Sequence, residues 1–144
     1  MAFQLPPIVK AAQRLVVEIE QAVRRFDRYH RYQIGSDLRA RSMAVYELSE
    51  RAWRDRAQQL KWVGELVWAI DHLLRTLQVA KLVNATTSFR QFEHLLRLVT
   101  ELGRQAGGWR RQLHPKGQSA QGQSPAAQRA QSLSTCTASA GANP

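Results

Sequence analysis

Apolar residues recur along this chain at alternating intervals of four and three residues, and this spacing constrains the fold more than any other feature. Near the N-terminus it connects Ile8, Ala12, Leu15, Ile19, Ala22 and Phe26. Side chains at these intervals lie along one side of an α-helix, as in the core-facing stripe of a helix bundle. Because Pro6 and Pro7 precede the stripe, and Pro is tolerated in a first helical turn, we predict a helix over residues 7–26.

Two further stripes predict a second and a third helix. The second helix ends near Arg56, and its stripe contains small residues: Ile34, Leu38, Ser42, Val45, Ser49 and Ala52. No Gly or Pro marks the connection that follows. The third helix runs to about Val83, with the stripe Leu60, Val63, Val67, Ile70, Leu74 and Leu77 and a flank of Trp62, Leu66 and Leu73.

The fourth stripe follows a polar turn in which Thr87 or Ser88 can cap a helix. It consists of Phe92, Leu95, Val99, Leu102, Ala106, Trp109 and Leu113, and Pro115 ends it. Strand-like alternation is absent from the sequence. Four helices with short connections predict an all-α protein, an antiparallel up-down four-helix bundle over residues 7–115.

The two ends of the sequence lie outside the predicted bundle. Residues 1–6 form an N-terminal extension. Residues 116–144 are rich in Gly, Ser, Ala and Gln with almost no apolar bulk, so we predict a disordered tail. The single cysteine, Cys136, lies in this tail and excludes an intramolecular disulfide.

The third and fourth helices carry apolar surface that one small bundle cannot hide. The third is apolar over most of its circumference, with Trp62 and Trp68 on different sides, which predicts burial against another subunit. In the fourth, Gly103 and Gly107 lie on one side of the helix beside Trp109, and each glycine costs roughly 1 kcal/mol relative to Ala. They indicate a surface for close packing, or else a fraying helix end.

The chain is strongly basic, with 21 Lys and Arg against 11 Asp and Glu, a net charge of +10 and a pI near 11.0. Most of the basic residues are Arg, which favours planar contact with phosphate. This charge points first to nucleic acid, then to an anionic membrane or an acidic protein; the alternative is a merely soluble basic protein. Neither a membrane-spanning segment nor a signal peptide is visible, so we expect a cytoplasmic protein without a membrane partner.

Catalytic and metal chemistry find little support in the sequence. A di-iron bundle needs Glu-x-x-His pairs, and no Glu precedes a His by three residues. Glu93 and His94 are adjacent and cannot face the same way. A Gly-rich phosphate loop, a nucleophile elbow and a Cys/His pairing are also absent. We therefore expect a binding protein, not an enzyme, with no cofactor and no metal.

The basic residues are the better functional candidates. Arginines surround the first turn together with Tyr29 and Tyr32, and such groups can hold phosphates and stack on unpaired bases. Arg51, Arg54 and Arg56 have acidic residues nearby, which predicts ion pairs. Fewer acidic residues lie near the remaining basic candidates: Arg75, Lys81, Arg97, Arg104, Arg110 and Arg111. Our nucleic-acid-binding candidates are Arg75, Lys81, Arg104, Arg110 and Arg111, then Arg28 and Arg31; the interface candidates are Trp62, Trp68, Gly103, Gly107 and Trp109.

Three motifs resemble one family of four-helix proteins. Residues 26–35 resemble its turn Phe-Pro-Arg-x-x-Arg-[aromatic]-x-Leu-Gly. Residues 73–77, Leu-Leu-Arg-Thr-Leu, resemble the Arg-Leu end of its helix-three motif. Residues 101–109 resemble its ending Glu-Ile-Gly-Arg-x-x-Gly-Gly-Trp. Together they resemble the accessory variability determinant (Avd) family of diversity-generating retroelements, which is related to the proteins encoded in ribosomal RNA intervening sequences.

The resemblance covers about residues 8–113 and implies a function. It implies a ring-like homopentamer that is prokaryotic or phage-encoded. The implied partners are a retroelement reverse transcriptase and its RNA or DNA. The family has no catalysis of its own and supports mutagenic retrohoming. Asp27 stands where the turn usually has Pro, and Asp71 where helix three commonly has a first Arg. The alternatives are an oligomeric basic scaffold that docks an acidic protein, and an intervening-sequence-type bundle, which could dock ribosomal RNA.

Overall fold

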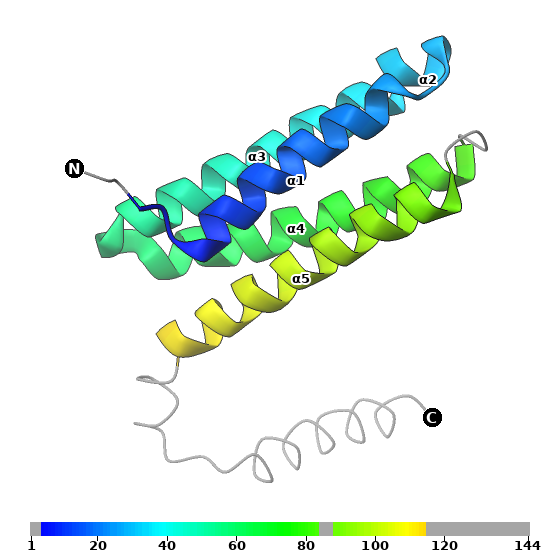
Figure 1. Ribbon diagram of the computed structural model, residues 1–144. Helices are drawn as coiled ribbons and strands as arrows, with labels where there is room; N and C mark the ends of the chain where they lie inside the picture. The colour runs from blue at the N-terminus through cyan, green and yellow to red at the C-terminus, as the bar shows by residue number, and fades with distance from the viewer. Residues whose placement is uncertain (1–3, 84–87, 115–144) are drawn as a thin grey trace, which may run out of the picture. The chain divides into compact units, whose positions relative to one another are not determined.

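The computed structural model describes residues 4–83 and 88–114 of the 144-residue chain. These residues are helical, without a strand, and four of their helices are long (Figure 1). The elements in order are α1 (Pro7–Arg24), α2 (Arg28–Tyr32), α3 (Ile34–Arg54), the 3-10 helix η1 (Arg56–Gln58), α4 (Gln59–Val83) and α5 (Phe89–Leu113). The prediction of an all-α fold with four long helices is confirmed.

Some predicted features lie outside the described residues. These are most of the connection between the third and fourth helices, the tail over 116–144 and Cys136. Residues Met1–Arg110 form one compact unit, and the second unit begins at Arg111. Of that second unit the structure describes only residues 111–114, which contain the last three residues of α5.

Helix α1 buries the side that its sequence predicts. All six residues of its stripe are buried, from Ile8 to Phe26. The helix itself ends at Arg24, two residues earlier than predicted. The backbone then tightens, because the amides of Arg25 and Phe26 donate to the carbonyls three residues before them, and Phe26 turns back into the core.

Helix α3 is the most closely packed helix, since its backbone approaches both α1 and α4 to within 8 Å. Small buried residues make this approach possible: Gly35, Ser42, Ser49 and Ala52. The two serines are buried without a polar cost, because Ser42 Oγ donates to the Arg39 carbonyl at 3.0 Å and Ser49 Oγ donates to the Tyr46 carbonyl at 2.7 Å. The predicted stripe of the second helix is therefore largely confirmed.

Helix α4 buries only part of its predicted stripe, namely Val63, Ile70 and Leu77. Leu66 and Leu73, placed on the flank from sequence, are fully buried, whereas Leu60 is 43% exposed. Val67 and Leu74 are only half-buried. The helix is apolar over most of its circumference, so the spacing of its apolar residues allows either of two sides to face the core. Contacts with the neighbouring helices, which the sequence does not display, select between them.

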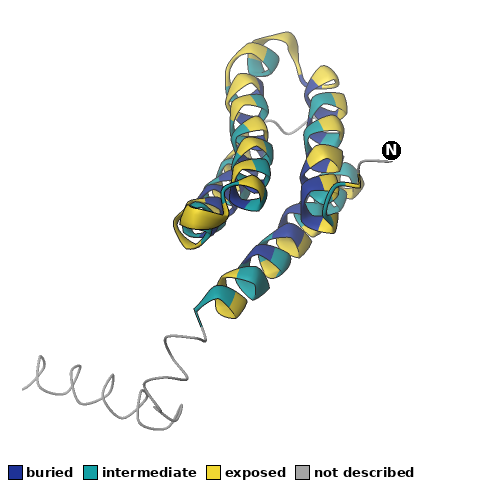
Figure 2. Ribbon diagram, turned by 90° about the vertical axis from the view of Figure 1, so that its left-hand side faces the viewer, coloured by how far each residue is buried: buried dark blue, intermediate teal, exposed yellow. Residues whose placement is uncertain are grey.

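Helix α5 begins as predicted with Ser88, whose Oγ accepts a hydrogen bond from the Gln91 amide at 3.1 Å. Its buried residues join those of α1, α3 and α4 in one apolar core: Leu95, Val99, Leu102 and Ala106. Figure 2 shows buried residues on the facing sides of the helices and exposed residues on the outer sides. The helix continues through its three glycines to Leu113, so they do not mark a frayed end.

Candidate nucleic-acid interface

The α2 corner, which we define as residues 25–36, joins α1 to α3 through the five-residue helix α2. Its packing depends on Gly35, which is buried at the start of α3. A Cβ at this position would lie 2.7 Å from Val23 Cγ1 and 3.1 Å from the His30 carbonyl oxygen. The first distance is too short for a Cβ and the second is tight, so a larger residue would have to push the corner away from Val23 of α1.

Side chains of the corner also bond its own backbone. Arg31 Nη2 donates to the Phe26 carbonyl at 3.3 Å, and Ser36 Oγ donates to the Tyr32 carbonyl at 3.2 Å. Arg31 Nε is buried without a hydrogen-bond partner. Arg31, one of our binding candidates from sequence, therefore has a structural role in holding the turn.

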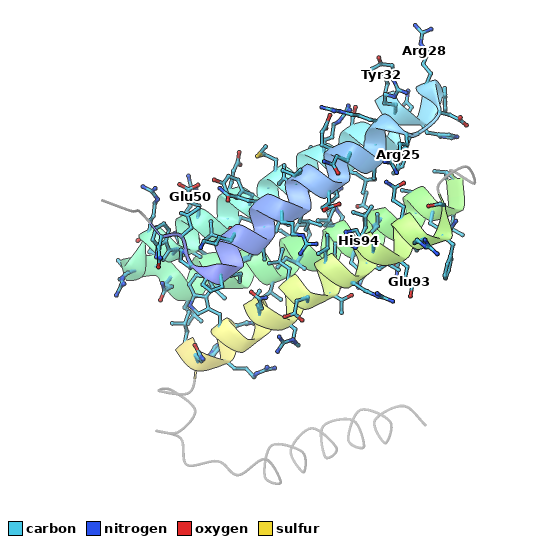
Figure 3. All side chains as sticks on the ribbon, in the orientation of Figure 1. Arg25, Arg28, Tyr32, Glu50, Glu93 and His94 are labelled. Carbon is cyan, nitrogen blue, oxygen red and sulfur yellow. The ribbon has the colours of Figure 1, made fainter. Side chains whose placement is uncertain are left out.

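The residues that point outward from the corner are aromatic and basic. Helix α2 buries none of its five residues, and the side chains of Tyr29 and Tyr32 are 71% and 63% exposed. Figure 3 shows Arg28 and Tyr32 projecting from the corner away from the other helices. The Tyr29 ring meets the edge of the His30 ring at 5.3 Å between centroids. The corner thus presents two aromatic rings beside an exposed guanidinium.

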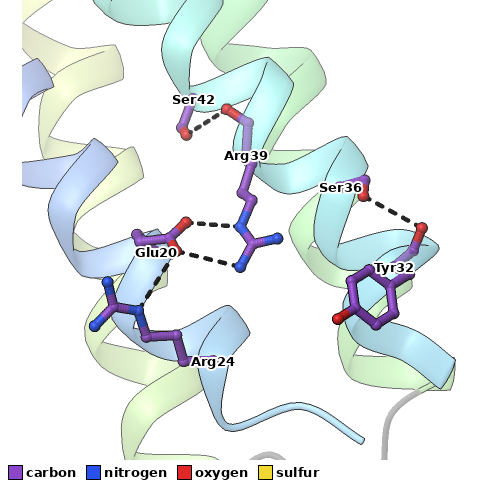
Figure 4. Close-up of polar contacts among 6 residues, drawn as sticks. All are labelled: Glu20, Arg24, Tyr32, Ser36, Arg39 and Ser42. Atoms are coloured by element: carbon purple, nitrogen blue, oxygen red, sulfur yellow. Dashed lines mark hydrogen bonds and ion pairs between the residues drawn. The ribbon is translucent and has the colours of Figure 1, made fainter. Parts of the chain in front are cut away.

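A carboxylate next to the corner pairs with some of its arginines. Arg39 Nε and Nη2 donate to Glu20 at 2.6 and 3.2 Å, and Arg24 Nε lies 3.5 Å from the same carboxylate (Figure 4). The hydrogen bond from Arg39, followed by its charge and by Arg24, lowers the pKa of Glu20. Arg25 and Arg28 form no ion pair with another described residue, and their charges remain available.

A cavity of about 320 Å³ lies between α1 and the first turns of α5. Its lining includes Arg25, Arg90 and His94, together with Glu18 and Ser88. His94 Nε2 is 3.4 Å from Glu18 Oε2, so the two side chains form an ion pair when the imidazole is protonated. We did not single out Arg90 and His94 from sequence, because nothing in their spacing places them beside Arg25.

Several candidate arginines on α4 and α5 have acidic partners. Arg75 Nε lies 3.1 Å from Asp71, and Arg97 Nη2 lies 2.9 Å from Glu93. Arg104 donates from Nε and Nη2 to the two carboxylate oxygens of Glu101. The sequence predicts fewer acidic neighbours here than around Arg51, Arg54 and Arg56, yet Arg75, Arg97 and Arg104 each form an ion pair with a carboxylate. On an exposed helix such pairs are weak and exchange with other partners, so binding by Arg75 and Arg104 stays a prediction.

The other candidates are dispersed along the helices. Lys81 lies in the last turn of α4, with its ammonium 5.9 Å from the Phe92 ring centroid. Arg110 and Arg111 are exposed near the C-terminal end of α5. The structure brings Arg28 and Arg31 together in one corner and does not gather the seven predicted residues into one site.

The tryptophans predicted at an interface have different surroundings. Trp62 Nε1 donates to Asp55 Oδ2 at 2.9 Å, and the cations of Arg51 and Lys61 lie 4.7 and 4.9 Å from its ring centroid. Its polar and aromatic surfaces are thus used within the chain. Trp68 is 66% exposed and stacks only on His72, at 4.9 Å between ring centroids.

The residues of the predicted small-residue surface of α5 also differ in their surroundings. A Cβ at Gly103 would lie 3.4 Å from Ile70 Cγ2, so this glycine supports packing between α4 and α5. A Cβ at Gly107 would have no neighbour within 4 Å. Trp109 is half-buried against the core. Gly107 is the member of this set that leaves space for a second molecule.

Neither a metal-binding group nor a membrane-spanning helix is found among the residues that the structure describes. Across residues 4–83 and 88–114, His, Cys, Asp and Glu form no group of three or more that could hold a metal ion. Among the described helices none has both the length and the apolar character to cross a membrane. Comparison of the chain with protein-family models, curated proteins and solved structures finds no match. The resemblance to the Avd family therefore rests on the three motifs alone.

Proposed function

We propose that this chain is a non-catalytic accessory subunit of a diversity-generating retroelement, which binds the element's reverse transcriptase and its RNA or DNA to support mutagenic retrohoming. The observation that carries this proposal is the α2 corner. The corner contains the first motif of the family resemblance. In it, Arg25 and Arg28 form no ion pair with another residue that the structure describes, and two tyrosines are exposed. Phosphate and unpaired bases are the chemistry that such a surface recognises.

Our proposal includes an up-down four-helix bundle assembled into a ring-like homo-oligomer, with five subunits implied by the resemblance. The outer side of α4 supports assembly, because it exposes apolar residues at both of its ends: Leu60, Trp68, Val79, Leu82 and Val83. Gly64, on the same helix, has no neighbour within 4 Å of an added Cβ, which leaves room for a second helix. Mass measurement in solution tests the assembly, and a monomer at micromolar concentration would contradict it.

A salt titration tests nucleic-acid binding. If about six phosphates of a single strand are neutralised, the logarithm of affinity should fall against the logarithm of salt concentration with a slope of about −4. Reversing the charge at Arg28 should lower both the affinity and the slope. The same reversal at Arg75, which is paired with Asp71, should have a smaller effect. A pull-down with a reverse transcriptase of a diversity-generating retroelement tests the second partner.

The alternative function is an oligomeric basic scaffold that docks an acidic protein, or an intervening-sequence-type bundle that docks ribosomal RNA. The pairing of Arg75, Arg97 and Arg104 with carboxylates favours the scaffold, since it reduces the charge left for phosphate on α4 and α5. The scaffold predicts retained protein binding and no salt-sensitive affinity for nucleic acid.

A further inference from the structure

The α2 corner combines a fixed backbone with a fully outward set of side chains. None of the five α2 residues is buried, so α2 adds no side chain to the apolar core. Yet Gly35, the buried Phe26 and the bond from Arg31 to the Phe26 carbonyl hold its backbone in place. Because the backbone of α2 is fixed and its side chains do not enter the core, these side chains are available to a partner.

Two of those side chains are suited to stacking. Tyr29 and Tyr32 are three residues apart in α2, an interval that places side chains on one side of a helix. Both rings are more than half exposed, and the described residues offer neither of their hydroxyls a hydrogen bond. Exposed aromatic rings stack on the faces of nucleobases, and this contact tolerates any base sequence.

The charges around the rings favour a polyanion. Six arginines and two aspartates lie between residues 24 and 41: Arg24, Arg25, Arg28, Arg31, Arg39 and Arg41, with Asp27 and Asp37. Arg24 and Arg39 share the Glu20 carboxylate, and Arg31 bonds the backbone. Three cations remain without an ion pair to a described residue: Arg28 in α2 beside the tyrosines, Arg25 just before α2, which lines the cavity between α1 and α5, and Arg41 further along α3, whose Nε is buried. An acidic peptide would need the cations alone and would leave the two rings unused.

We propose that the α2 corner binds single-stranded RNA or DNA, with unpaired bases stacked on Tyr29 and Tyr32 and phosphates held by Arg25 and Arg28. The inference rests on the proposed nucleic-acid-binding function and specifies the strand state of its ligand. A duplex keeps its base faces inside the stack, whereas a single strand can turn its bases outward. The corner therefore selects unpaired segments, such as a template loop or a displaced strand.

The test compares the affinity of the full chain for three labelled probes by fluorescence anisotropy. The probes are a mixed-sequence single-stranded RNA, the DNA strand of the same sequence, and that DNA strand paired with its complement. The wild-type protein should bind both single strands more tightly than the duplex. The double variant Tyr29→Leu, Tyr32→Leu should lose about fivefold per ring, or about 25-fold in all, on single strands only.

Matched variants separate stacking from hydroxyl chemistry and from charge. Tyr29→Phe with Tyr32→Phe keeps both rings and should retain single-strand affinity. Arg28→Gln should reduce the single-strand salt slope by about 0.7. Arg56→Gln removes the same charge at an exposed position beyond the other end of α3 and should leave the slope unchanged. Helicity by circular dichroism verifies that each variant is folded.

Each remaining outcome overturns the proposal in a distinguishable way. If the leucine variant keeps its single-strand affinity, nucleic acid binds elsewhere, and the proposed function survives without this site. Equal binding of single strands and duplex by the wild type, or equal loss in the phenylalanine and leucine variants, excludes base stacking. Absence of binding to all three probes at low salt overturns both this inference and the nucleic-acid part of the proposed function.

Discussion

The α2 corner and the corner at the other end of α3 use the same residue types in opposite ways. The second corner, which we call the η1 corner, comprises residues 51–62 and lies about 30 Å away along the 21-residue helix α3. There Trp62 bonds Asp55 and is covered by Arg51 and Lys61, so its aromatic and charged groups interact with one another. In the α2 corner the rings and two of the guanidinium groups face solvent.

The difference shows that aromatic residues beside arginines do not by themselves mark a binding surface. In the η1 corner Asp55 also accepts the Gln58 amide at 3.3 Å and so caps η1, which makes this corner a stable chain reversal without Gly or Pro. The cavity beside it, about 460 Å³, is lined by three carboxylates together with two arginines and Trp62: Glu47, Glu50 and Asp55 with Arg51 and Arg54. In this corner Arg54 pairs with Glu50, and Arg51 and Lys61 lie over Trp62, which distinguishes it from a surface whose cations are available to a polyanion.

The largest effect that would sharpen this comparison is expected at Gly35. Changing Gly35→Ala places a methyl group 2.7 Å from Val23 Cγ1 and should lower the free energy of unfolding by up to about 3 kcal/mol. The matched control is Ala40→Gly at an exposed position of the same helix, which should lower stability by about 1 kcal/mol through helix propensity alone. Urea denaturation measures both, and a neutral Gly35→Ala variant would show that the corner is loosely packed.

The second test compares aromatic residues of the two corners. Trp62→Leu should cost about 2 kcal/mol, because it removes a hydrogen bond worth about 1 kcal/mol and two cation–π contacts of about 0.5 kcal/mol each. Tyr29→Leu should change stability by less than about 0.5 kcal/mol, as expected for an exposed residue. Thermal unfolding measures the loss of stability in both variants. Equal losses would mean that aromatic residues also stabilise the α2 corner.

The third test concerns the carboxylate that joins α1 to α3 below the α2 corner. Glu20→Gln removes the paired bonds to Arg39 and the contact with Arg24, and should cost about 1 kcal/mol or less, since both partners are partly exposed. The loss should shrink at high salt because the interaction is screened. A variant as stable as the wild type at low salt would show that the pair does not position α3.

The smallest expected effect is the pH dependence of the pair on α5. The hydrogen bonds from Arg104, then Gln105, lower the pKa of Glu101 from its ordinary 4.5 to about 2. A carboxylate whose pKa is lowered in the folded state stabilises the protein above the unfolded value, and this contribution disappears as the pH falls from about 4.5 to about 2. Glu101→Gln should therefore differ from the wild type in melting temperature at pH 6 and converge with it near pH 2. A constant difference across this range would contradict the pairing.

Much of the fold could be predicted from sequence because helices α1, α3 and α5 each have one narrow apolar stripe. Where the stripe is narrow, as from Ile8 to Phe26, only one side of the helix can be buried, and the structure buries that side. Ser88 could be identified as a helix cap because its effect is local. The basic and aromatic character of the α2 corner was also evident in the residues themselves.

Tertiary structure alone decided which side of α4 faces the core and which cations remain unpaired. Leu66 and Leu73 are buried in place of Leu60, since an apolar circumference offers no preferred side until other helices cover one. The roles of Arg31 and Arg39 depend on the Phe26 carbonyl and on Glu20 of another helix, and the closeness of Arg25, Arg90 and His94 depends on α1 lying beside α5. The contacts of Arg39 with Glu20 and of Arg25 with α5 join segments distant in sequence, and local spacing carries no information about them.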